Sequence, residues 1–249
     1  MNIIQTSKPT DQQKLDMSSL VAACQKKEPL SLSAPLEDDL GYDILLGYEG
    51  PHLAAMAFLF FSTDTLCECC VFVHPQNRRN RLFTGLLDPI LDLVEARQKA
   101  LGQPIDFCFL ADEKTPSAMA ALKAIGAEYW YSEHKMERPL TSADREFVMD
   151  SLSIQEADDH LYSAVLDGRV IGTCAILPSQ NRIYLYAFQI REDYQGQGYG
   201  SQFLSGMLAI LAHMGLVVSL QVSGQNYIAR NLYKKAGFST VESLAYYLY

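Results

Sequence analysis

The sequence lacks several features that would place the protein in a membrane or on nucleic acid. Its apolar runs are short, and the stretch 53–61 is far below the ~20 residues that a membrane-spanning helix needs. The polar segment 1–14 offers no secretory leader. Basic residues are outnumbered by acidic ones, 20 to 29, and the net charge of −9 does not suit phosphate backbones. We therefore expect a cytoplasmic globular protein with no membrane or nucleic-acid partner. The negative net charge suits a cationic substrate better than an anionic one.

The sequence also lacks the cysteine and histidine spacing of a metal site. Alternation along a strand would send Cys67 and Cys69 to one face and Cys70 to the other, and no second pair completes a zinc set. The other cysteines lie mostly in apolar runs, as buried thiols of a reducing compartment do. The five histidines are scattered. We expect no metal, and we interpret these residues as structural.

What is present is an internal repeat, with an offset of 111 to 117 residues between corresponding blocks. A β-hairpin is predicted over residues 42–61 and again over residues 161–177. In each half a strand then leads through a turn into a helix, with strands at 67–73 and 183–190. One-turn spacing of apolar residues predicts the helices, as in Phe203, Leu204, Met207, Leu208 and Leu211.

A third block completes each half. It consists of a strand, a short helix and a glycine, ending at Gly126 in the first half and at Gly237 in the second. We expect a final pair of strands after each glycine. Residues 10–27 form an additional predicted helix in the first half only.

The repeat predicts two mixed α/β domains in tandem, each a largely antiparallel sheet with helices on both faces. We place the domains at residues 1–140 and 141–249, because residues 138–142 have the composition of a linker. Neither half carries a surplus of basic residues.

The second half contains a glycine-rich turn between its strand and its amphipathic helix. Residues 195–201 read Gln-Gly-Gln-Gly-Tyr-Gly-Ser. The first-turn amides of a helix lack partners and the helix dipole favours negative charge, so such a turn can bind phosphate. Gly198 and Gly200 would let a pyrophosphate approach the backbone without meeting a Cβ atom. By itself this pattern also fits a tight turn with no function.

A second motif follows the next apolar strand. Asn226 begins a segment with Ala229, Asn231 and Tyr233, which ends in Gly237 and Phe238. Together with the glycine turn, this segment resembles the GNAT superfamily of acetyltransferases, over about residue 161 to the C-terminus. The combination is much more specific than either motif alone.

The resemblance implies a site for acetyl-CoA in the second half and gives its residues their roles. The strand backbone at 188–190 would pair with the pantetheine arm, the turn would hold the pyrophosphate, Asn226 would contact the cofactor, and Tyr233 would protonate the leaving thiolate. The implied cofactor-binding residues are Phe188, Gln189, Ile190, Gln195, Gly196, Gln197, Gly198, Tyr199, Gly200, Ser201, Asn226 and Tyr233. From the residues alone, Asn226 could equally be a helix cap and Tyr233 a core aromatic.

The general base is missing from the place where GNAT relatives often carry it. The strand 184–190 contains no acid. An amine of pKa about 10 is neutral roughly one time in a thousand at pH 7, which is about 4 kcal/mol that the enzyme must supply. Water relayed to Glu192, to Asp193 or to an acid of the first half is a possible source, and we assign no base.

The first half departs from the same template. Arg81 and Phe83 stand where Gly198 and Gly200 stand in the second half, and Leu122 replaces Tyr233. We expect side chains to fill this phosphate cradle, and Thr115 or a neighbouring residue lies near the place of Asn226. We interpret the first half as a domain that kept the fold and lost the cofactor. Anion binding by Arg78, Arg79 and Arg81 is the alternative, and a solvated charge run is the simplest reading.

Two functions of different classes follow. The first is an acetyl-CoA-dependent N-acetyltransferase that acts on the primary amine of a small molecule or a peptide. The second is a CoA-binding regulatory or interaction protein without turnover. The acceptor and the oligomeric state cannot be read from the sequence, because acceptor contacts come from loops that vary within one fold.

Overall fold

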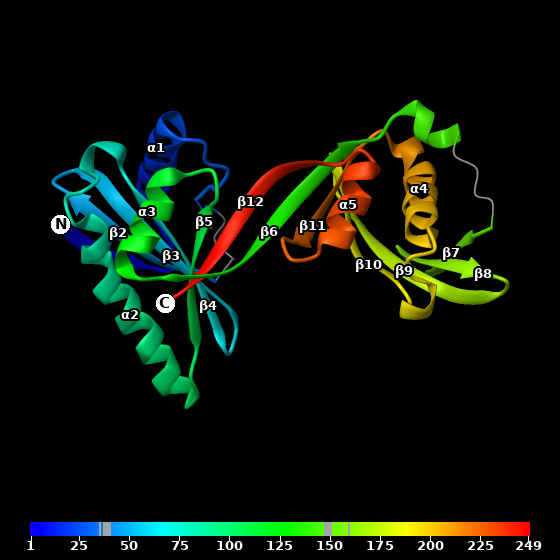
Figure 1. Ribbon diagram of the computed structural model, residues 1–249. Coiled ribbons are helices and arrows are strands. Elements are labelled where there is room, and N and C mark those ends of the chain that lie inside the picture. Colours follow the sequence, from blue (N-terminus) through cyan, green and yellow to red (C-terminus); the bar gives the residue numbers. More distant parts are fainter. Residues whose placement is uncertain (35, 37–40, 147–150, 159) are drawn as a thin grey trace. The chain divides into compact units, whose positions relative to one another are not determined.

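The computed structural model describes residues 1–34, 36, 41–146, 151–158 and 160–249, which form two compact units. Unit 1 comprises residues 1–132 and 243–249, and unit 2 comprises residues 133–242. Each unit is a mixed sheet with helices packed on it (Figure 1). None of the helices in these described residues is both long enough and apolar enough to cross a bilayer.

Unit 1 is built on a sheet of strand order β1-β2-β3-β4-β5-β12. Helices α1 and α2 cover its two faces, and α3 packs on the same face as α2. Its elements are β1 (Asn2–Thr6), α1 (Asp11–Lys27), β2 (Asp43–Glu49), β3 (His52–Thr63), β4 (Leu66–Val73), α2 (Leu82–Leu101), β5 (Asp106–Asp112) and α3 (Pro116–Ile125). The hairpin and the three helices predicted here are confirmed, whereas β1 was not predicted.

Unit 2 has the strand order β6-β11-β10-β9-β8-β7. Its elements are β6 (Glu128–Pro139, entering from unit 1), β7 (Ser153–Asp158), β8 (Leu161–Leu166), β9 (Arg169–Pro178), β10 (Arg182–Ile190), α4 (Tyr199–Leu211), β11 (Val217–Ser223), α5 (Tyr227–Lys235) and β12 (Ser239–Leu248, leaving for unit 1). The apolar stripe of α4 and the ring of Tyr233 on α5 join one core cluster. Both helices described in this unit therefore cover the same face, and the expectation of helices on both faces was wrong for unit 2.

Each unit takes one strand from the other half of the chain. Within unit 1, residues 244–248 of β12 pair with residues 108–112 of β5. Within unit 2, residues 133–139 of β6 pair with residues 217–223 of β11. A single long strand follows Gly126 and another follows Gly237, so the expected strand pair after each glycine was wrong. The compact units accordingly differ from the predicted boundary at residues 140 and 141, because a strand belongs to the sheet that completes its hydrogen bonds.

The cysteines behave as the sequence analysis predicts. All six are buried and unpaired, and burial raises the pKa of Cys67, Cys70, Cys108 and Cys174 to about 12. Such thiols stay protonated at neutral pH and are poor nucleophiles and poor metal ligands. No group of three or more potential metal ligands occurs among the residues described above.

Candidate functional site

The candidate site begins where two parallel strands of unit 2 separate. Strand β10 pairs with β11 through residues 182–184, opposite residues 217–219. Past Tyr184, β10 continues to pair with β9 as far as Ile190, with a bulge around Ala187, whose φ is 50°. A strand separated from its neighbour offers backbone donors and acceptors to an extended ligand. The segment 188–190, predicted to pair with the pantetheine arm, lies on this stretch of β10.

The glycine-rich turn joins β10 to α4 and is held open by its own side chains. The Gln195 Nε2 donates to the Ile190 carbonyl at 2.8 Å, and the Gln197 Nε2 donates to the Asp193 carbonyl at 3.0 Å. Gly196 and Gly198 have φ values of +73° and +86°, a region that L-residues rarely adopt. These bonds and glycines fix the backbone, and they leave the amides of the turn free of side-chain caps.

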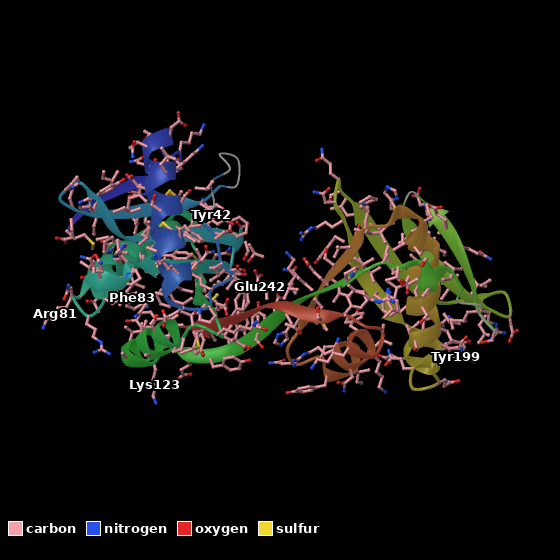
Figure 2. The ribbon with its side chains drawn as sticks, turned by 90° about the horizontal axis from the view of Figure 1, so that it is seen from above. Tyr42, Arg81, Phe83, Lys123, Tyr199 and Glu242 are labelled. Carbon is pink, nitrogen blue, oxygen red and sulfur yellow. The ribbon has the colours of Figure 1, made fainter. Side chains whose placement is uncertain are left out.

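Five consecutive backbone amides, at residues 196–200, donate no hydrogen bond to another described residue. The first amides that do so are those of Ser201 and Gln202, which both donate to the Gly198 carbonyl, at 3.1 and 3.2 Å. Helix α4 therefore begins with open donors at its positive end, as an anion site requires. Figure 2 marks Tyr199 in this first turn. A Cβ atom at Gly200 would point toward Ile190 and Leu232, both 3.7 Å away.

Asn226 lies at the start of α5 and acts as its N-cap. Its Oδ1 accepts a hydrogen bond from the Ala229 amide at 3.0 Å, which satisfies one orphan donor of the helix. The cap reading is therefore confirmed. The cap uses only the carbonyl oxygen, so the two donors of Nδ2 are left for a ligand.

Tyr233 is buried on α5, with only 6 % of its surface exposed. Its ring contacts Phe188 of β10 at a centroid distance of 6.3 Å and Phe238 at 5.9 Å. Burial, together with the nearby Cys174, raises the pKa of the Tyr233 phenol to about 12. Its hydroxyl forms no hydrogen bond with the part of the chain that the structure describes. The phenol is thus a protonated donor next to the separated strand.

The corresponding loop of unit 1 keeps the backbone form without the glycines. Arg79 and Arg81 have φ values of 66° and 60°, matching Gly196 and Gly198. A non-glycine residue in this left-handed backbone conformation costs on the order of 1 kcal/mol. Figure 2 shows the exposed Arg81 side chain extending outward. The side chain of Phe83 instead turns toward the sheet, where its ring lies 5.8 Å from that of Phe109.

A cavity of about 740 Å³ lies in unit 1 and not beside the glycine turn. Its lining includes Phe83 and Leu122, the counterparts of Gly200 and Tyr233. The cavity volume does not decide which unit binds the cofactor, because a pyrophosphate needs unobstructed backbone amides and the acetyl transfer needs a proton donor. Leu122 offers no proton. Arg78 is already paired with Glu28, which also accepts from Ser117, so of the three arginines only Arg79 and Arg81 lack an ion pair with a described residue.

Comparison with known proteins identifies the fold and the class. Residues 119–238, just under half of the chain, match the model of the acetyltransferase (GNAT) family. A GCN5-related N-acetyltransferase from Sphaerobacter thermophilus superimposes with a TM-score of 0.79 at 17% identity, over 99% of this chain and 95% of its own. A tandem GNAT protein from the clavulanic acid biosynthesis pathway superimposes with a TM-score of 0.66 at 12% identity, over 100% of this chain and 98% of its own.

A curated relative shares sequence as well. The uncharacterized N-acetyltransferase YycN of Bacillus subtilis (strain 168) is 34% identical over 64 residues, which is 25% of this chain and 41% of that protein. Residues 119–238 therefore match a GNAT acetyltransferase domain in sequence, and over its whole length the chain has the fold of tandem GNAT proteins.

Proposed function

We propose that unit 2 is an acetyl-CoA-dependent N-acetyltransferase that acts on the primary amine of a small molecule or a peptide. The observation that carries the proposal is the row of free amides at residues 196–200, at the N-terminus of α4 and beside the separated strand β10. The match of residues 119–238 to the GNAT family model supports the class of reaction. The six unpaired cysteines support a reducing compartment such as the cytoplasm.

The residues present fit the cofactor. The turn 195–201 would hold the pyrophosphate through its amides, residues 188–190 of β10 would pair with the pantetheine arm, and the Asn226 Nδ2 would donate to it. When bound, acetyl-CoA supplies the thioester that the amine attacks. The Tyr233 hydroxyl would donate its proton to the leaving sulfur, and backbone amides at the separated strand would stabilise the oxyanion.

The proposal is tested by incubating the protein with acetyl-CoA and primary amines while free thiol is measured. The panel comprises polyamines, aminoglycosides, amino acids and peptides. We expect thiol release that depends on one class of amine. Tight binding of acetyl-CoA with no turnover on any amine would favour a CoA-binding regulatory protein, which the lack of an acid on β10 makes the second candidate.

A separate prediction concerns the number of sites. Titration calorimetry should give one acetyl-CoA per chain, because unit 1 carries Phe83 at the helical position of Gly200, where we expect its ring to exclude the pantetheine arm. Arg81→Ala should change the affinity by less than about twofold, since an exposed charge outside the site contributes little. Loss of binding in Arg81→Ala, or a second site of similar affinity, would show that unit 1 also binds the cofactor.

A further inference from the structure

Strand β6 brings an acid from the first half of the chain into unit 2. In the pairing of β6 with β11, Glu133 lies opposite Ser223, Lys135 opposite Gln221, and Glu137 opposite Ser219. The alternate residue Met136 is fully buried in the core beneath α4 and α5. Because successive side chains of a strand point to opposite faces, Glu133 faces away from these helices.

The face that carries Glu133 also carries the aromatic side chains of β10. Ile183 and Leu185 belong to the core, so Tyr184 and Tyr186 lie on the opposite face. The Tyr184 hydroxyl donates to Gln221 Oε1 at 3.0 Å, and the two tyrosine rings stack at 6.0 Å. In the residues that the structure describes, no helix of unit 2 covers this face. An acceptor can therefore approach β10 from here.

The register places Glu133 level with the site of transfer. Tyr184 pairs with Ser219 at the last joined position of β10 and β11. Ser223 is four residues beyond Ser219, and Phe188 is four residues beyond Tyr184. Glu133, opposite Ser223, therefore lies at the level of the β10 segment proposed to hold the pantetheine arm, on the side opposite Tyr233.

Glu133 is unpaired among the described residues, unlike Glu137 on the same strand and face. Glu137 is bound by Arg182 at 2.9 Å and by Lys135 at 3.7 Å, whereas Glu133 has no ion pair or hydrogen bond with any described residue. Burial raises the pKa of its carboxyl, and burial together with the nearby Glu133 charge raises the pKa of Tyr184. The other charged or titratable groups that β6, β10 and β12 place on the described part of this face are Lys135, Glu137, Arg182, Tyr186 and Glu242.

We propose that Glu133 is the general base of unit 2, taking a proton from the ammonium group of the acceptor. The inference rests on the proposed function. The carboxylate takes one proton, and the neutral amine nitrogen forms a bond to the acyl carbon while the carbon–sulfur bond breaks. The sulfur takes the Tyr233 proton, and the second proton that nitrogen loses returns through water to the phenolate. The Glu133 proton passes to solvent, so one proton is released per turnover.

The test is the pH dependence of kcat/KM, measured with acetyl-CoA and the amine of the panel with the highest turnover. The wild type should bind the ammonium form of the amine and use deprotonated Glu133. Its kcat/KM should therefore be constant at pH values between the pKa of Glu133 and the pKa of the amine. Glu133→Gln should lower kcat/KM at pH 7 by about 10²–10³-fold, within the usual effect of a positioned base. The loss should shrink about tenfold per pH unit toward the pKa of the amine, because the free-amine fraction grows by that factor.

Matched variants separate this role from a structural one. Glu133→Asp should restore part of the plateau, and Glu137→Gln, on the same strand and face, should keep the wild-type profile. Acetyl-CoA affinity and melting temperature should be unchanged in Glu133→Gln. An active wild type with a Glu133→Gln profile of unchanged shape, lowered or not, would overturn the base and leave the proposed function standing. A wild type inactive on every amine of the panel would overturn both.

Discussion

Replacing Gly200 by Phe is expected to abolish acetyl-CoA binding, with a rise in Kd of at least about 100-fold, or ~2.7 kcal/mol. The substitution copies Phe83, which stands at the same helical position in unit 1. A Cβ at residue 200 meets only ordinary contacts with Ile190 and Leu232 at 3.7 Å, but it points toward β10 and α5. A phenyl ring built in that direction would occupy the path proposed for the pantetheine arm.

The same variant should fold normally, which makes calorimetry a clean measurement. Glycine costs about 1 kcal/mol relative to alanine inside a helix and phenylalanine costs less, so α4 is not weakened. Ile210→Phe, at the exposed far end of α4, is the matched control and should bind acetyl-CoA like the wild type. Retained affinity in Gly200→Phe would mean that the cofactor does not pass between β10 and α5.

Replacing Tyr233 by Phe is expected to lower turnover by about 10²–10⁴-fold, the usual contribution of a positioned acid. The change removes one oxygen and keeps the ring against Phe188 and Phe238, so folding and acetyl-CoA affinity should change little. The measurement is single-turnover thiol release with the best amine of the panel, which reports the chemical step. Tyr227→Phe, exposed on the same helix, is the control and should have wild-type rates.

The raised pKa of Tyr233 gives this prediction a pH signature. A phenol of pKa about 12 remains protonated through pH 10, so the donor is present over the whole range in which the amine titrates. An alkaline loss of activity centred below about pH 10 would therefore not arise from Tyr233. Near-full turnover in Tyr233→Phe, with chemistry shown to be rate-limiting, would mean that the tyrosine is core packing and that water protonates the sulfur.

The elements of this protein that were predicted correctly are those that local sequence patterns specify. The hairpins, the amphipathic stripe of α4 and the extra helix α1 depend on side chains within one or two turns of each other, and Thr10 even caps α1 through a capping box. The glycine turn is local as well, since the positive φ values of Gly196 and Gly198 are a property of the backbone at those residues.

The directions of the Arg81 and Phe83 side chains in unit 1 could not be predicted from the sequence. The sequence aligned Arg81 with Gly198 correctly, and the matching left-handed conformations show it. It could not tell that Arg81 extends outward while Phe83 points inward, because that depends on where the loop lies over the sheet.

By itself, the sequence determined the repeat, the glycine turn, and the positions of Asn226 and Tyr233, because each depends on residues close together in the chain. Only the tertiary structure decided which sheet each terminal strand joins. Strand β6 pairs with β11 across about 80–90 residues of chain and β12 pairs with β5 across about 130–140, and no local pattern encodes such a partner. For the same reason, an acid 100 residues before Tyr233 could be suspected from the sequence, but Glu133 could be placed in unit 2 only by the register of β6 against β11.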